Sequence, residues 1–600
     1  MRPFIVTELE AGKLPRWGLL ALCALYVLPG FIGRDPWRTQ DAAGFGIALS
    51  MMRGDASDWL MPNIANLAAA SEGPLPFWLA ALLGQLAAPL VGEHGGVRLT
   101  VVALLTLALV LVWYTTYGLA RRPGVQPSDP FGASASQVDY GRAIADSGLL
   151  VLMATLGLIV RMHETTGEPA QIVWIAAFLF GCTLALDRPT AGAAIAGAAI
   201  GATLLSRGAG TAIALLLVLV LLPLACRDYR LVGRRLLPVA VAIALAVALP
   251  WPLALSGGGV AERAHLLDWA AWNLGSISGP TLSSLHYFAR TVPWFFWPAW
   301  PVALWAAWRW RGRWDEPAVA LPMLTAVMLA LRALVSPSGA ETWLLPITVP
   351  LALLAAMGMP TLKRGIVNLI DWFSVTTFTL FGIAIWAYWI ALMTGFPPRM
   401  AFRASQLAPG FTPQWIVVEI VLGGLATIAW LGLVRWRVSR QPRMIWRAMA
   451  LSCGGLVLAW FLLMTLWLPV FNERNTYRDV AHSLGAAFDG ADGCIETRGL
   501  ERAPRASFHY FARLRFAARG EQCDWLLIQD EGPAARMAPA PVPGWNQLWQ
   551  GQRRSDRHER FRLYRRSADT DTPSTRVTPS ARVTPSARVT PAAHATTSGR

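Results

Sequence analysis

Charged residues are scarce in this sequence. They make up 15% of its 600 residues, whereas 54% are hydrophobic and 29 are tryptophan. A soluble core of this size would not bury so much apolar side chain, so the composition argues against an ordinary soluble protein. The lipid bilayer is therefore the expected solvent for most of the chain.

A nucleotide-binding signature is also missing, because no Gly-rich phosphate loop lies between the apolar runs. The net charge of +16 could suggest a nucleic-acid partner. The arginines, however, cluster in short loops without the interleaved aromatic residues of an RNA- or DNA-binding surface. Such loops are typical of membrane topology signals, and we expect no nucleic-acid partner.

Apolar runs that could cross a membrane recur along most of the chain. A spanning helix needs roughly 20 predominantly apolar residues. The first run has no small-residue cleavage site after it, so it is interpreted as a retained helix and not as a signal peptide. The sequence predicts about 13 spans, near residues 17–33, 97–119, 143–160, 170–186, 189–205, 209–226, 236–255, 291–308, 316–334, 342–358, 373–394, 414–434 and 448–469.

The basic loops predict the orientation of these spans. The strongest clusters, expected in the cytoplasm, are 227–235, 309–313, 363–364 and 435–447. An odd number of spans then puts the N-terminus inside and the segment after Pro469 outside. Two long loops, 34–96 and 256–290, also fall outside. Within the first of them, residues 75–91 are apolar enough to lie along the membrane surface, and nearly long enough to span it.

The pattern changes after the last apolar run. We expect a membrane domain over residues 1–469 and a small periplasmic α/β domain over 470–566, with a strand near 524–528. From Thr572 to Pro591 the chain repeats Thr-Pro-Ser-Ala-Arg-Val with slight variation and little apolar surface, which indicates a disordered tail over residues 567–600.

Six cysteines divide into two groups. Cys494 and Cys523 lie in the predicted periplasmic domain, where an oxidising compartment would allow a disulfide between them. Two unrelated thiols are the alternative. The others fall in or beside apolar runs and behave as small hydrophobic residues: Cys23, Cys182, Cys226 and Cys453.

The first external loop carries an ordered set of motifs. Residues 34–45 read RDPWRTQDAAGF, 57–63 read SDWLMPN and 72–78 read EGPLPFW, followed later by Ser-Arg-Gly at 206–208 and Trp-Leu-Leu-Pro at 343–346. This order resembles the GT-C superfamily of polytopic glycosyltransferases, specifically the group of protein O-mannosyltransferases and lipid A aminoarabinose transferases. Members have an acidic residue after the first span, a Gly-Asp-Trp-x-x-Pro turn and a Lys-Pro-Pro-x-x-Tyr-Trp motif.

Three departures accompany the resemblance. The usual Asp-Glu pair of the family is here Asp41 followed by Ala42, and the basic residue of the Lys-Pro-Pro motif is replaced by Glu72 or Gly73. The chain also has only two lysines.

The resemblance implies a GT-C-like fold and the transfer of a sugar from a polyprenyl-phosphate donor to a lipid or protein acceptor. The reaction would take place at the periplasmic face of a bacterial inner membrane. A lipid or glycan transporter or flippase is one alternative, although no internal repeat supports it. A non-catalytic, lipid-binding member of the same fold is another, and Ala42 in place of a second acid favours it.

The resemblance also implies the acidic residues of the site. Asp41 occupies the family's acidic position and would accept or orient the proton of an acceptor hydroxyl; a helix cap is the alternative. A second acid is expected outside the membrane between the third and fourth spans. Asp146 is excluded because the predicted topology places it on the cytoplasmic side. In the loop on the external side, Glu164 is the first choice and Glu168 the second. A solvated loop of polar residues is the alternative.

The donor phosphate needs a cationic partner. Arg207, in the Ser-Arg-Gly motif, could bind it through charge-assisted hydrogen bonds, unless it is a simple interfacial anchor. Arg290, in the second external loop, is a further candidate. Four side chains of the external loops could together hold a divalent cation, although their spacing gives no support for it: Asp41, Glu72, His163 and Glu164.

Overall fold

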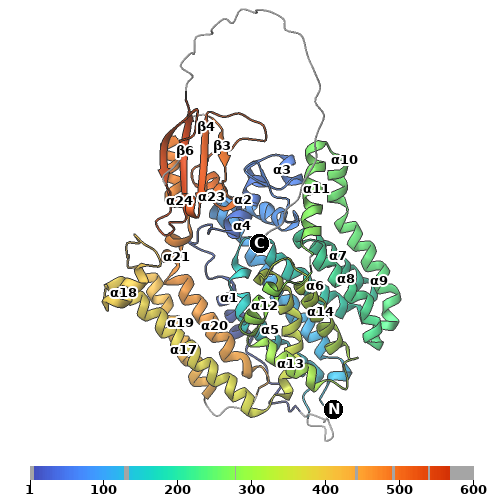
Figure 1. Ribbon diagram of the computed structural model, residues 1–600. Helices are drawn as coiled ribbons and strands as arrows, with labels where there is room; N and C mark the ends of the chain where they lie inside the picture. Colours follow the sequence, from blue (N-terminus) through green and yellow to red (C-terminus); the bar gives the residue numbers. More distant parts are fainter. Residues whose placement is uncertain are drawn as a thin grey trace, which may run out of the picture.

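The structure is a computed structural model that describes residues 6–127, 134–277, 279–438, 444–488, 493–537 and 541–567. A long bundle of helices carries a small mixed sheet at one end (Figure 1). The predicted fold class, a helical membrane part followed by a small C-terminal α/β region, is confirmed. The predicted tail lies outside the described residues from position 568 onward.

The helical part of the chain contains 21 described α-helices. In chain order they are α1 (Arg16–Val27), α2 (Gln40–Arg53), α3 (Ala56–Leu60), α4 (Leu75–Ala120), α5 (Gln137–Ala154), α6 (Gly167–Ala185), α7 (Pro189–Arg207), α8 (Ala209–Ala225), α9 (Arg227–Ala248), α10 (Pro250–Gly257), α11 (Val260–Gly275), α12 (Leu282–Phe295), α13 (Ala299–Arg309), α14 (Pro317–Leu334), α15 (Glu341–Leu344), α16 (Thr348–Gly358), α17 (Arg364–Thr394), α18 (Pro398–Ser405), α19 (Val417–Val438), α20 (Arg447–Thr465) and α21 (Leu468–Asn475).

Nine of the described helices are long and apolar enough to cross a membrane, or ten if the bent pair Gln137–Ala154 and Leu156–His163 counts as one span. The chain is therefore a multi-pass membrane protein. Shorter apolar helices, α1 and α8, coincide with two further predicted spans. The total of 13 spans and the position of the bundle relative to the two membrane faces remain predictions.

The apolar stretch at 75–91 forms the first limb of α4. At Gly92 the helix is interrupted by a φ of 75°, a left-handed conformation that glycine adopts without a steric penalty. The second limb then folds back, and the hydroxyl of Thr100 donates to the carbonyl of Leu79 (3.4 Å). The first limb is therefore one arm of a hairpin packed against the following apolar helix.

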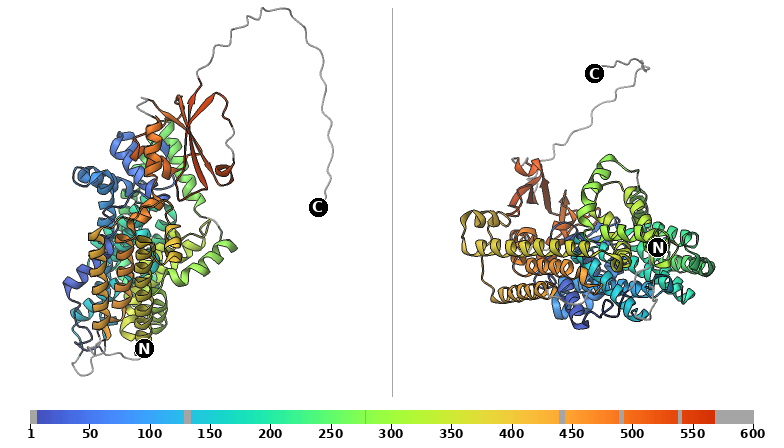
Figure 2. Two further views of the ribbon diagram at one scale, coloured as in Figure 1. Left: turned by 90° about the vertical axis from the view of Figure 1, so that its left-hand side faces the viewer. Right: turned by 90° about the horizontal axis from the view of Figure 1, so that it is seen from below.

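Contacts between the loops distinguish the two ends of the bundle. At the end far from the sheet, the Arg313 side chain donates to the carbonyl of Gly124 (2.9 Å). At the sheet end, the Asn472 side chain donates to the carbonyl of Gly33 (2.7 Å). The left-hand view in Figure 2 shows the sheet at one end of the molecule and the helical bundle extending away from it. Both contacts join loops that the basic clusters predict to share a side.

The C-terminal sheet has four strands in the order β3-β4-β6-β5. Strands β3 and β4 are parallel and the other pairs are antiparallel. One face packs against α22 and α23 in a core that includes Leu484, Phe508 and Leu527. The elements are α22 (Arg478–Phe488), β3 (Ile495–Arg498), α23 (Arg502–Phe511), β4 (Trp525–Glu531), α24 (Pro533–Arg536), β5 (Trp545–Gly551) and β6 (Glu559–Arg566). A two-stranded ribbon, β1 (Asn63–Ile64) and β2 (Leu67–Ala68), belongs to the first external loop.

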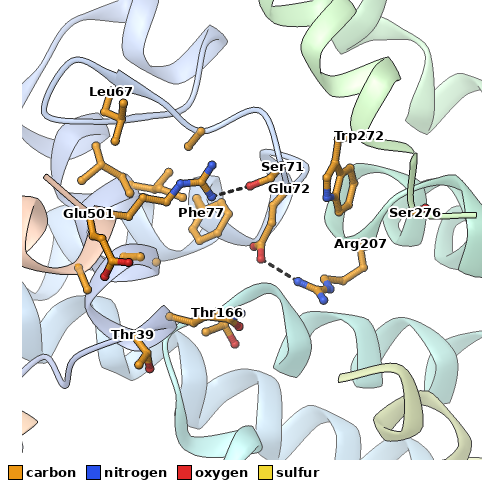
Figure 3. A pocket seen from close by; sticks show the side chains of 18 of the residues that line it. Thr39, Leu67, Ser71, Glu72, Phe77, Thr166, Arg207, Trp272, Ser276 and Glu501 are labelled. Atoms are coloured by element: carbon orange, nitrogen blue, oxygen red, sulfur yellow. Dashed lines mark hydrogen bonds and ion pairs between the residues drawn. The ribbon is translucent and has the colours of Figure 1, made fainter. Parts of the chain in front are cut away.

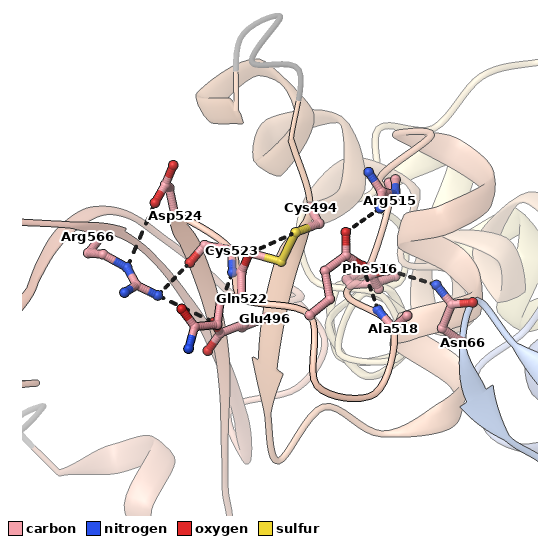
Figure 4. Close-up of a disulfide and its surroundings, with 11 residues drawn as sticks. Asn66, Cys494, Glu496, Arg515, Phe516, Ala518, Gln522, Cys523, Asp524 and Arg566 are labelled. Atoms are coloured by element: carbon pink, nitrogen blue, oxygen red, sulfur yellow. Dashed lines mark hydrogen bonds and ion pairs between the residues drawn. A yellow bond between two sulfur atoms is a disulfide. The ribbon is translucent and has the colours of Figure 1, made fainter. Parts of the chain in front are cut away.

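Cys494 and Cys523 form a disulfide at the start of β3 and just before β4, as the sequence predicts (Figure 4). Nearby, the side chain of Asn66 donates to the carbonyl of Phe516 (2.9 Å). The disulfide therefore closes the loop of the C-terminal region that contacts the β1–β2 ribbon.

A topology test follows from the arginine distribution. A reporter fused after Pro469 should read periplasmic, and one fused near Arg230 should read cytoplasmic, because basic loops remain inside. Enzymatic reporters that are active on only one side of the membrane provide the measurement. Two fusions that report the same side would contradict the predicted orientation.

Candidate functional site

A cavity of about 840 Å³ opens at the sheet end of the bundle (Figure 3). Its wall combines the first external loop, the starts and ends of membrane helices, and α23 of the C-terminal region. The polar residues on the wall are Thr39, Gln40, Ser71, Glu72, Thr166, Arg207, Ser276, Glu501 and Arg502, and Trp272 and Trp343 add aromatic surface. A volume of this size fits the range of small-molecule sites in proteins.

Glu72 and Arg207 are in direct contact on the wall of this cavity. The Arg207 guanidinium donates to a Glu72 carboxylate oxygen at 2.7 Å. The contact depends on Gly73, whose N–H donates to the carbonyl of Ser206 (3.1 Å). A Cβ atom on Gly73 would lie 2.0 Å from the carbonyl oxygen of Leu205, so only glycine permits the loop to dock on the end of α7.

Arg207 serves a second carboxylate. Its other terminal nitrogen lies 3.5 Å from an oxygen of Glu168, which is buried at the start of α6. Burial raises the pKa of Glu72, the charge of Arg207 opposes the rise, and the charge of Glu168 adds to it. Of the two acids, only Glu72 lies on the cavity wall. Glu72 is thus a carboxylate that can exchange a proton close to neutral pH.

The C-terminal region contributes the facing wall. Arg502, at the start of α23, donates to the hydroxyl of Ser71 (2.6 Å), next to Glu72 in the chain. A second guanidinium therefore reaches the cavity from a segment more than 400 residues away. The sequence contains no local signal that would have identified Arg502.

Thr39 lies on the wall in a backbone conformation that is rare for a β-branched residue. Its φ is 78° and its ψ is −135°. Such a conformation costs on the order of 1–3 kcal/mol and persists only where the surroundings enforce it. Gln40 follows it on the same wall.

Asp41 stabilises this turn and lies behind the cavity wall. Its carboxylate accepts a hydrogen bond from Arg34 (3.0 Å), from the N–H of Trp37 (3.1 Å) and from the N–H of Thr165 (2.7 Å). A second guanidinium, that of Arg98, lies 4.0 Å away. The side chains of Arg34 and Asp41 are 1% and 2% exposed.

This environment changes the role expected for Asp41. Burial raises its pKa, but the charges of Arg34 and Arg98 and the hydrogen bond from Thr165 outweigh burial and lower the pKa to about 2. A carboxylate of such low basicity is a poor proton acceptor. Asp41 is also not among the residues on the cavity wall. Asp41 is therefore a buried anchor and not a residue of the cavity wall, and this environment does not favour the proton-accepting role expected for it. It is not a side-chain N-cap either, because that position of α2 is Thr39.

The other predicted acid and its histidine neighbour lie beside Asp41, but not on the cavity wall. Glu164 pairs with Arg161 at 3.1 Å, and burial raises its pKa to about 7. Both ring nitrogens of His163 lie within hydrogen-bonding distance of main-chain carbonyls, those of Ile159 (2.5 Å) and Tyr26 (2.9 Å). His163 is therefore fully engaged in packing.

Two further expectations differ from the structure. Arg290 is exposed on α12 and does not line the cavity, so it cannot share the site with Arg207 in this arrangement. Among the described residues, no group of three or more His, Cys, Asp or Glu side chains could hold a metal ion. Two of the four proposed ligands form ion pairs instead, Asp41 with Arg34 and Glu72 with Arg207.

The sequence matches no protein-family model and no curated protein. Its structure is similar to two crystal structures of ArnT from Cupriavidus metallidurans. The form bound to undecaprenyl phosphate gives a TM-score of 0.65 at 14% identity, over 91% of this chain and 97% of that chain. The apo form gives 0.63 at 15% identity over the same shares. An apo oligosaccharyltransferase from Archaeoglobus fulgidus gives 0.40 at 12% identity, over 82% of this chain and 63% of that chain. The likeness to ArnT shows that the chain has a GT-C fold.

The Asp41 cluster leads to a stability prediction. Asp41→Asn should lower the free energy of unfolding by about 3–5 kcal/mol, because it leaves the buried charge of Arg34 without its partner. Since the folded-state pKa is lowered, the stabilisation by Asp41 is present above its ordinary pKa and is lost as the pH falls toward about 2. Thermal unfolding of the purified protein measures the change.

Asp268→Asn, at an exposed position of α11, is the matched control and should leave the melting temperature unchanged. Equal melting temperatures for the wild type and Asp41→Asn would contradict the anchor role.

Proposed function

We propose that this protein transfers a sugar from a polyprenyl-phosphate donor to a lipid or protein acceptor at the periplasmic face of the membrane. The observation that supports this best is the Glu72–Arg207 pair on the wall of a large cavity at one end of a GT-C fold. ArnT, which has the same fold, was crystallised with undecaprenyl phosphate.

In the proposed reaction, the acceptor hydroxyl oxygen attacks the anomeric carbon of the donor sugar. The bond between that carbon and the phosphate oxygen breaks, and the polyprenyl phosphate leaves with the electron pair. The hydroxyl proton passes to Glu72, whose raised pKa makes it a better acceptor than Asp41.

Arg207 has the complementary role in this proposal. Its guanidinium can form two parallel charge-assisted hydrogen bonds to the phosphate as negative charge develops on it. Arg502 supplies a second positive charge on the opposite wall, 2.6 Å from the Ser71 hydroxyl. Asp41 and Glu164 act indirectly, by fixing the turn at residues 39–41 and the loop at residues 164–166 that border the cavity.

A turnover assay tests the proposal. Purified protein is incubated with a panel of radiolabelled polyprenyl-phosphate sugars and with candidate lipid and peptide acceptors. Donor-dependent labelling of an acceptor supports the enzyme. Donor binding without turnover across the panel would instead indicate a non-catalytic lipid-binding protein.

Substitutions in the cavity should separate the two roles. Arg207→Gln and Glu72→Gln are each expected to lower kcat/KM on the order of a hundredfold, as removal of an electrostatic or acid–base group does. Arg290→Gln, which removes an exposed arginine, is the matched control and should retain activity. A loss in Glu164→Gln with normal turnover in Glu72→Gln would reassign the base to Glu164.

The pH profile gives a second readout of Glu72. Because burial raises its pKa, the acid limb of kcat/KM should lie above the value of about 4.3 for an ordinary glutamate. Activity falls below that limb as the base becomes protonated. The limb should be absent from the residual activity of Glu72→Gln.

A further inference from the structure

A second polar cavity, of about 380 Å³, lies at the opposite end of the bundle. Three arginines from three helices line it: Arg364 at the start of α17, Arg437 near the end of α19 and Arg447 at the start of α20. We propose that this cavity binds the phosphate headgroup of an anionic membrane phospholipid. The inference is independent of the proposed transferase activity.

Two of the arginines are held firmly in place. Arg437 forms an ion pair with Asp371, one helical turn beyond the cavity wall on α17. Arg447 is 4% exposed and donates to the carbonyls of Trp436 (3.2 Å) and Arg437 (2.8 Å). Its guanidinium also lies 4.8 Å from the centre of the Trp436 ring. These contacts fix two guanidinium groups at one edge of the cavity.

The charge around the cavity is not balanced. Asp371 compensates for Arg437, and among the described residues of the wall Glu10 is the only acidic one. The Glu10 carboxylate already accepts a hydrogen bond from the N–H of Thr7 (3.1 Å). Arg364 is exposed at the rim and forms no ion pair within the described ranges. An excess of positive charge therefore surrounds a space large enough for a phosphate group, and arginine suits this group because its planar fork can bind two phosphate oxygens.

The position of the cavity favours a lipid over a free phosphate. Helices α17, α19 and α20 are candidate spans, and the cavity lies where they begin or end, at the level expected for lipid headgroups. Just beyond it on α17, Leu369 and Trp372 are 63% and 67% exposed. They provide apolar surface along which acyl chains can lie. Basic pockets between spanning helices are known to bind anionic headgroups on the cytoplasmic side, the side that the arginine distribution predicts here.

A bound headgroup would contact the N-terminal segment as well as the three helices. The N-terminal segment reaches the cavity at Val6 and Glu10, and the N–H of Ile445 donates to the Glu10 carbonyl (3.0 Å). The occupant would thus bridge the N-terminal segment and helices α17, α19 and α20. The expected consequence is a higher melting temperature in the presence of the lipid.

Native mass spectrometry of the full-length protein in detergent tests the inference, with phosphatidylglycerol as the probe and phosphatidylcholine as the uncharged reference. The wild type should retain phosphatidylglycerol in preference to phosphatidylcholine. Arg364→Glu should weaken that binding on the order of tenfold, because the substitution replaces a charge that attracts the anionic headgroup with one that repels it. Arg311→Glu makes the same charge change at an exposed position of the same end, outside the cavity, and should bind like the wild type.

Arg447→Gln provides a second variant inside the cavity, and it should also lose phosphatidylglycerol. Inorganic phosphate, added in excess, should not displace the lipid, because it lacks the acyl chains. Equal retention by the wild type, Arg364→Glu and Arg447→Gln would overturn the inference. Displacement of the lipid by inorganic phosphate would also overturn it, because the cavity would then be a site for free phosphate.

Discussion

The geometry of the sheet end of the bundle depends on one buried ion pair, that of Arg34 with Asp41. Its carboxylate binds the turn that begins α2 and the loop at residues 164–166, which belongs to a different pair of helices. Removal of either partner would leave an uncompensated buried charge, which is strongly destabilising. The glycine at position 44 completes the contact, because a Cβ atom there would lie 1.8 Å from the carbonyl oxygen of Thr165. These contacts between the turn and the loop at residues 164–166 place Thr39 and Gln40 on the cavity wall.

The amount of nearby positive charge separates the acidic residues into two kinds. Asp41 has two guanidinium groups nearby and an N–H bond from each of two segments, so it remains ionised and contributes to structure. Glu72 shares Arg207 with Glu168, so each carboxylate receives only part of the compensating charge. An incompletely compensated carboxylate beside open space can take up a proton, which is the property that acid–base chemistry requires.

The sequence predicted the fold better than the site. Long apolar runs predict the helices directly, and basic loops predict the side of the membrane on which their ends lie. The two cysteines in the polar region predict a disulfide. Glu72 and Arg207 were both identified, but not their contact, because it depends on the docking of Gly73 on α7. The low basicity of Asp41 was not predicted, because it depends partly on Arg98, which lies 57 positions away in the chain and approaches Asp41 only in the folded protein. Arg502 was missed for the same reason, because charges that meet only in the folded chain leave no periodic or local signal.

The most direct test of the central claim is an experimental structure of the protein with polyprenyl phosphate bound. The account predicts the phosphate within hydrogen-bonding distance of the Arg207 guanidinium, with the Glu72 carboxylate facing the position that the sugar would occupy. A phosphate bound elsewhere, for example beside Arg16 in the apolar groove between α1 and α4, would contradict it.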